Sequence, residues 1–105
     1  MAKDLMFLTK VDLAKLPPLG STDGKGEEAV AVVKFFTPTS NWSWFMTEYD
    51  PATETGFGLV FGAEVELGYF DLAEMRAVKG RVWVEKDRFF TPATLKDIRA
   101  KAGNL

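Results

Sequence analysis

Short apolar stretches separated by turn residues run through most of this 105-residue chain. The clearest is AVAVVKFF, residues 29–36, which is rich in β-branched and aromatic side chains and has a single charge, Lys34. Runs of this length and composition are typical of β-strands. The pattern predicts five strands, over residues 29–36, 41–49, 57–61 and 64–70 and within residues 81–90.

The segments between the first four predicted strands carry the residues that favour turns. TPTS (37–40) and DPATETG (50–56) contain Pro, Ser, Thr and Asp. Gly62 and Ala63 fit a two-residue hairpin of type II′, because glycine suits the first central position of that turn. Strands joined by such short turns run antiparallel. We therefore expect a sheet built mostly from hairpins.

Capping residues predict three short helices around this sheet. Thr9 and Asp12 have the spacing of a capping box, with Asp in place of the usual Glu. Asp71 is expected to cap a helix that ends near Gly80. Thr91 is expected to cap the last helix, which then runs towards the C-terminus.

These elements predict an α+β fold: an antiparallel sheet of about five strands, mostly hairpin-connected, with short N-terminal, late-inserted and C-terminal helices. The chain length fits one domain over residues 1–105. Residues 19–28, LGSTDGKGEE, contain three glycines and are expected to form a mobile loop within that domain.

The stretch SNWSWFMTEYD, residues 40–50, is dense in aromatic residues. Side chains alternate between the two faces of a strand, which predicts that Trp42, Trp44 and Glu48 share one face and that Phe45 and Tyr49 share the other. The predicted helices are few and short, so we expect core on one face and an exposed apolar patch on the other. Exposed Trp and Tyr side chains are common anchors of protein interfaces.

The absence of two residue types limits the chemistry. The sequence contains no Cys and no His, which excludes disulfides, thiolate catalysis, Cys/His zinc sites and imidazole bases. Its serines, Ser21, Ser40 and Ser43, lie in no known nucleophile motif. We expect a protein that is not an enzyme and has no cofactor.

Charge is unevenly distributed along the chain. The net charge is −2, but residues 1–70 carry five Lys/Arg against ten Asp/Glu, and residues 71–105 carry eight against five. This is either ordinary scatter or an acidic surface available to a basic partner. Glu48, Glu64 and Glu66 are expected to be exposed acids that could meet across the sheet. A Mg²⁺ site is the weaker interpretation of that grouping.

The N-terminal stretch MAKDLMFLTKVDL has no long apolar segment and no small-residue cleavage site. It does not resemble a signal peptide, and no apolar run approaches the roughly 18–20 residues of a membrane span. A cytoplasmic location is therefore expected.

Four segments, taken together, resemble an uncharacterised bacterial family, a domain of unknown function. They are LPPLGST (16–22), VVKFFTPTSNWSWFMTEYD (32–50), FGLVFGAEVELGYFDLAEM (57–75) and, more loosely, VEKDRFFTPATL (84–95). Asp71 departs from the Ser expected there, although both residues cap helices. The resemblance implies no catalytic residues. It does imply a setting on plasmids, conjugative elements and phages, where small acidic proteins often inhibit host defence.

The leading hypothesis is a non-enzymatic protein-binding accessory protein of a mobile element, for example an anti-CRISPR or anti-restriction inhibitor that occupies a basic nuclease or effector complex. The residues expected to contact the partner are Trp42, Trp44, Glu48, Tyr49, Asp50, Glu64 and Glu66.

The alternative is a single-stranded nucleic-acid-binding module that uses an aromatic sheet face. Its basic residues would be Arg76, Lys79, Arg81, Lys86 and Arg88.

Overall fold

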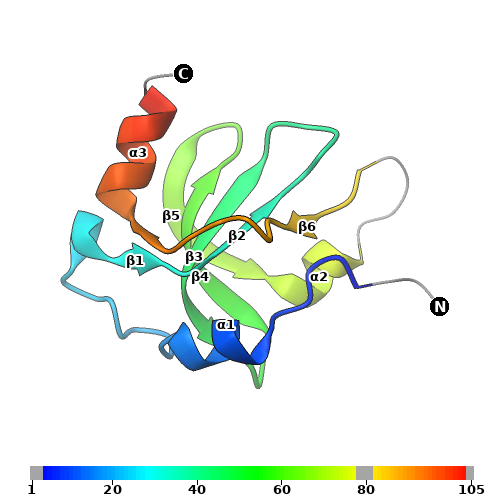
Figure 1. Cartoon of the computed structure of the whole chain (residues 1–105), viewed down its shortest axis with the longest axis horizontal. Helices are drawn as coiled ribbons and strands as arrows, with labels where there is room; N and C mark the ends of the chain where they lie inside the picture. Colours follow the sequence, from blue (N-terminus) through cyan, green and yellow to red (C-terminus); the bar gives the residue numbers. More distant parts are fainter. Residues whose placement is uncertain (1–3, 78–81, 104–105) are drawn as a thin grey trace.

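The computed structural model describes residues 4–77 and 82–103, which form a twisted antiparallel sheet and three short helices (Figure 1). This is the α+β architecture that the sequence predicts. In chain order the elements are α1 (Lys10–Lys15), the 3₁₀ helix η1 (Gly26–Glu28), β1 (Val30–Ala31), β2 (Val33–Phe36), β3 (Ser43–Asp50), β4 (Thr55–Phe61), β5 (Val65–Asp71), α2 (Leu72–Arg76), β6 (Glu85–Lys86), β7 (Ala93–Thr94) and α3 (Leu95–Gly103).

The main sheet has the strand order β5-β4-β3-β2-β6, and every neighbouring pair is antiparallel. The predicted strand 29–36 is in fact two strands. The break comes at Val32, whose N–H still donates to the Met46 carbonyl at 2.9 Å. The residues before Val32 form β1, which lies outside the main sheet and pairs with β7 in a second, two-stranded sheet.

Both faces of the main sheet carry a hydrophobic core, so the expectation that one face is left uncovered is wrong. Helix α2, Met6 of the N-terminal segment and Val84 pack on the first face, and β1 and α3 pack on the second. The buried residues of the first cluster are Met6, Val33, Phe35, Met46, Tyr49, Leu72, Met75 and Val84. Those of the second are Ala29, Ala31, Leu59, Leu95 and Ile98.

A β-bulge changes the predicted alternation along β3. The pairing between β3 and β4 shifts between Met46 and Glu48, which leaves Thr47 as the extra residue. The Thr47 hydroxyl donates to the carbonyl of Phe57 at 3.1 Å, within the bulge. Because one extra residue reverses the alternation, Tyr49 joins Met46 in the first core, and Glu48 lies on the opposite face.

Two of the three helix caps are confirmed. Thr9 accepts a hydrogen bond from the Asp12 N–H at 3.0 Å, and Asp71 accepts one from the Glu74 N–H at 3.1 Å. Helix α2 ends at Arg76, and the predicted end near Gly80 lies outside the described residues.

The third cap is wrong. Thr94, rather than Thr91, accepts the N–H of Asp97, at 3.2 Å. Helix α3 begins at Leu95 because the residues before it first pair with β1 as a strand.

Two predicted strand features also differ. The hairpin between β4 and β5 pairs Phe61 with Val65, so its loop has three residues rather than two, and Gly62 lacks the positive φ of a type II′ turn. The strand predicted within residues 81–90 is reduced to β6.

Candidate functional site

Five of the seven residues predicted to bind a partner lie near the two ends of β3, and the other two, Glu64 and Glu66, lie in the β4–β5 hairpin and in β5. Trp42 and Trp44 lie at the start of β3, and Glu48, Tyr49 and Asp50 lie at its end. The β3–β4–β5 register aligns Trp44 with Val60 and Glu66, on the first face. Glu48 aligns with Phe57 on the other face, so the expected meeting of Glu48 with Glu66 does not occur.

Glu48 is buried rather than exposed, with 1% of its surface accessible. Its carboxylate accepts the N–H of Gly20 at 2.7 Å and the N–H of Thr22 at 2.8 Å, together with the Thr22 hydroxyl. Burial by itself would raise the pKa of Glu48, but these hydrogen bonds outweigh it and hold the pKa below its usual value. Glu48 therefore joins residues 20–22 to the sheet.

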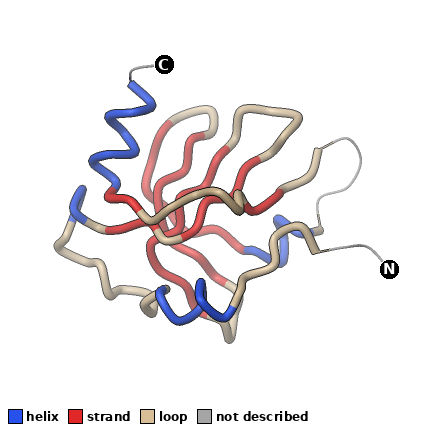
Figure 2. Tube along the Cα trace, viewed as in Figure 1, coloured by secondary structure: helices blue, strands red, loops and turns tan. Residues whose placement is uncertain are grey.

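The segment before Gly20 covers an edge that β2 leaves open. Strand β2 pairs with β3 only as far as Met46. Further along β3, the Tyr49 N–H donates instead to the Pro17 carbonyl, at 3.0 Å. Figure 2 shows the following loop running along the side of the sheet towards η1. The first part of the predicted mobile loop thus has two backbone hydrogen bonds to a buried side chain.

Tyr49 and Asp50 are also occupied within the fold. Tyr49 is buried in the first core, and burial, followed by the nearby charge of Glu54, raises the pKa of its phenol. Asp50 accepts hydrogen bonds from the Ala52 N–H at 3.0 Å and the Thr53 hydroxyl at 2.9 Å, which order the turn into β4. Neither side chain is placed to anchor a partner.

An exposed aromatic surface remains at the start of β3. The Trp42 and Trp44 rings lie 5.8 Å apart, and Trp42 is 44% exposed. The Trp42 ring lies directly over the bare backbone of Gly62, where an added Cβ would come within 2.4 Å of it. We call Trp42, Trp44, Val60 and Gly62 the tryptophan surface. Exposed Glu66 shares the face and cross-strand row of Trp44 and Val60.

Replacing Gly62 with alanine is expected to displace the Trp42 ring, since the new methyl group would occupy its place. The ring is half exposed and can move outwards, so the loss of stability should be small, about 1 kcal/mol. Tryptophan emission should shift to longer wavelength. Gly68→Ala is the control, because an added Cβ there meets no atom within 4 Å. Unchanged emission in Gly62→Ala would contradict this placement of Trp42.

Sequence reasoning missed a second exposed surface, on β5. Val65, Leu67 and Tyr69 point to the second face and are 46%, 45% and 69% exposed, in a row along the outermost strand. Tyr69 also packs on Phe57, with ring centroids 4.8 Å apart. Alternation in VELGYF predicts that the three side chains share a face, but their exposure depends on the tertiary structure, because they lie outside the core cluster on that face. We call Val65, Leu67 and Tyr69 the β5 row.

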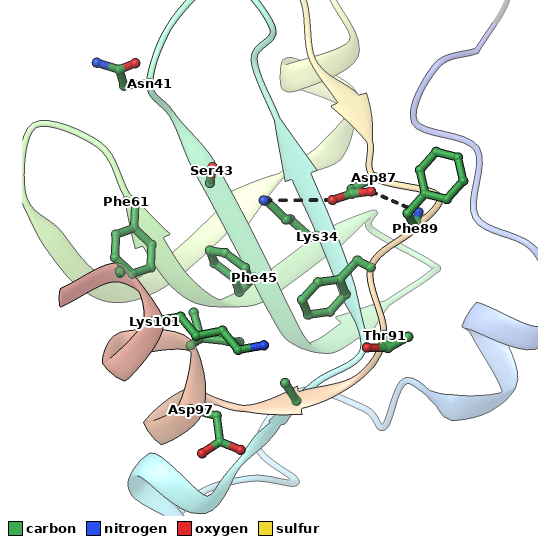
Figure 3. Close-up of a pocket in the computed structure, with 14 residues that line it drawn as sticks. Lys34, Asn41, Ser43, Phe45, Phe61, Asp87, Phe89, Thr91, Asp97 and Lys101 are labelled. Atoms are coloured by element: carbon green, nitrogen blue, oxygen red, sulfur yellow. Dashed lines mark hydrogen bonds and ion pairs between the residues drawn. The ribbon is translucent and has the colours of Figure 1, made fainter. Parts of the chain in front are cut away.

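The second face also contains a hollow of about 530 Å³ between the sheet, α3 and residues 87–93 (Figure 3). Its floor is aromatic. Phe45 contacts Phe61 and Phe90 edge-to-face, with ring centroids 5.5 and 5.7 Å apart. Lys34 lies over the Phe45 ring, with Nζ 5.4 Å from the centroid.

The charges around this hollow are balanced. Lys34 Nζ lies 3.9 Å from Asp87 Oδ2, and Lys101 and Asp97 both line the side formed by α3. An aromatic floor with matched charges suits an apolar group better than a phosphate. Ser43 also lines the hollow, as does Lys34, which is paired with Asp87.

The residues proposed for nucleic-acid binding are largely occupied by other contacts. Arg76 pairs with Glu54 at 2.8 Å and with Asp4 at 3.4 Å. Lys86 pairs with Asp12 at 2.6 Å. The guanidinium of Arg88 lies 5.9 Å from the Phe89 ring centroid. Lys79 and Arg81 lie outside the described residues.

Within residues 4–77 and 82–103, no three acidic side chains come together as metal ligands. None of the helices described has the length and apolar character of a membrane span.

The fold and its exposed surfaces define a small α+β protein with a five-stranded antiparallel sheet, core on both faces and apolar side chains along one edge. The family described as "Protein of unknown function (DUF2958)" matches residues 3–102, so the chain belongs to this family. This confirms the predicted membership of a domain family of unknown function. Neither the curated proteins nor the solved structures contain a match to the chain.

Proposed function

We propose that this protein is a non-enzymatic binding protein that acts by contact with another protein. The observation that carries the proposal is the β5 row, three large apolar side chains exposed side by side on the outermost strand. Contiguous exposed apolar side chains of this kind are typical of interaction surfaces. The tryptophan surface adds two rings near the β4–β5 hairpin, of the residue type that most often anchors an interface.

The acids around these surfaces support a basic partner. Glu64 and Glu66 are both exposed, and neither forms an ion pair within the described residues. Complementary charge at the rim of an interface increases the association rate and disfavours partners of the same sign. Of the residues first expected at the interface, the proposal therefore keeps Trp42, Trp44, Glu64 and Glu66, and it adds the β5 row.

The proposal extends to a role as an accessory protein of mobile genetic elements that inhibits host defence. Its support is the resemblance described above and the acidic, apolar character of the exposed surfaces. Such a surface can compete with nucleic acid for a basic channel. Single-stranded nucleic-acid binding is less well supported, because Arg76 and Lys86 are paired with acids.

Affinity capture at physiological salt tests the proposal. The wild-type protein is expected to retain a specific protein from a bacterial host lysate. The double variant Leu67→Lys/Tyr69→Ala should retain at least about tenfold less, as expected for loss of central apolar contacts. The matched control is Phe89→Ala, which removes a more exposed ring, 87% accessible, away from β5.

Equal retention by the double variant and the wild-type protein, or no retained protein at all, would refute binding through β5. The inhibitor role also requires that the retained protein belongs to a nucleic-acid-binding defence complex. Retention of an unrelated protein would refute that role and leave protein binding intact.

A further inference from the structure

The two edge strands of the main sheet differ in length and in what covers them. At one edge, β6 has two residues, and its Lys86 N–H donates to the Leu5 carbonyl at 2.8 Å, so the N-terminal segment covers it. At the other edge, β5 has seven residues and pairs with β4 alone among the described strands. The outward N–H and C=O groups of β5 thus have no strand partner in the described chain.

Strand β5 lacks most of the features that block pairing at a sheet edge. It contains no proline and no lysine, and its register with β4 continues without a bulge over seven residue pairs, from Val65 to Asp71. Edge strands of stable monomers are usually short, bulged or protected by lysine or proline. A long regular edge with an apolar row on one side is the geometry that accepts an added strand.

The charges on and beside β5 favour one kind of added strand over another. Glu66 projects from the face opposite the β5 row, Glu64 precedes the strand, and Asp71 ends it; none of the three forms an ion pair within the described residues. A second copy of this chain would bring two such acidic strands together, which like-charge repulsion disfavours. A basic segment gains attraction at the same positions.

We propose that β5 binds an extended basic segment of the partner protein as a sixth strand, with apolar side chains against the β5 row and Lys or Arg side chains on the face of Glu66. This inference rests on the proposed function and specifies how the partner is held. The predicted ligand alternates basic and apolar residues, because successive side chains of a strand point to opposite faces. Backbone hydrogen bonds contribute affinity, and the alternation contributes specificity.

The test uses the full chain and a labelled synthetic peptide of about eight residues, lysine alternating with valine, a length that matches β5. Fluorescence anisotropy should show binding that weakens with salt. A peptide of the same composition, with its lysines in one block, should bind at least about tenfold more weakly, since it cannot place all its apolar side chains on one face. Glu66→Lys should weaken binding similarly, whereas Asp23→Lys, with the same change of charge, should not.

Backbone methylation separates strand addition from simple charge attraction. In a strand, the N–H groups of alternate residues point to the same side. N-methylation of one alternate set of the peptide's residues should abolish binding, and methylation of the other set should preserve it. Equal binding of the two methylated peptides, or of the alternating and blocked peptides, would overturn the inference.

Sedimentation of the wild-type protein completes the test, with a monomer expected. A dimer that dissociates in Leu67→Lys would place a second copy on β5 and overturn the basic occupant. If the alternating peptide fails to bind but capture from lysate still depends on the β5 row, the strand-addition inference fails and the proposed function stands.

Discussion

Replacing Gly58 with alanine is expected to destabilise the protein by about 3 kcal/mol or more, the upper range for overpacking a core. Gly58 lies in β4, where the backbone of β3 approaches closely: an added Cβ would stand 1.9 Å from the Phe45 carbonyl oxygen and 3.0 Å from Met46 Cα. Both contacts are with backbone atoms, so no side-chain rotation can relieve them. Chemical denaturation at neutral pH measures the effect.

Gly68→Ala is the matched control. Gly68 is the direct cross-strand partner of Gly58 on β5, yet an added Cβ there meets nothing within 4 Å. Its effect should fall between neutral and a gain of about 0.5–1 kcal/mol, because alanine restricts the unfolded chain more than glycine does. Similar losses of stability in the two variants would show that the close approach of β3 to β4 is not the reason that Gly58→Ala destabilises the protein.

Replacing Glu48 with alanine is expected to cost about 3–4 kcal/mol, because buried donors left without an acceptor cost about 1–3 kcal/mol each. The variant leaves the N–H groups of Gly20 and Thr22 and the Thr22 hydroxyl without their common acceptor. Exposed Glu66→Ala is the control and should change stability by no more than about 0.5 kcal/mol. Hydrogen exchange at Gly20 and Thr22 should accelerate in Glu48→Ala alone.

The loss at Glu48 should also depend on pH. The folded protein holds the pKa of Glu48 below its ordinary value of 4.5, so the ionised carboxylate stabilises the fold above that value and loses its effect as the pH falls through the folded pKa. Glu48→Gln has no such titration. The difference in unfolding free energy between wild type and Glu48→Gln should therefore narrow below about pH 4.5. A constant difference would show that the carboxylate charge contributes nothing.

The features that the sequence predicts correctly are local. Thr9 and Asp71 cap helices because a short polar side chain reaches an N–H three residues ahead, whatever packs around it. The main-sheet strands are recognisable because apolar runs between turn residues favour extended structure. Their antiparallel order follows from the short connections between β2 and β5.

Some residues of the candidate surface could also be predicted from the sequence. The sequence predicts that Trp42 and Trp44 share one face of a strand near acidic residues, and Trp44 and Glu66 do lie on one face, with Trp42 exposed and Trp44 partly buried against the first core. It also predicts that Glu48 lies with them, which is wrong. The strand alternation on which that prediction depends is interrupted by a single extra residue, Thr47, whose position is set by the pairing of β3 with β4.

The sequence alone thus determined two of the three helix caps, the strands β3, β4 and β5 and the absence of imidazole and thiol chemistry, since each depends on neighbouring residues or on composition. The tertiary structure alone decided which side chains are buried and which edge is open. Glu48 is buried because residues 17–22 fold across the end of β3, and the β5 row is exposed because it lies outside the core that β1 and α3 build on the second face. Both depend on contacts between segments distant in the chain, which local propensity does not encode.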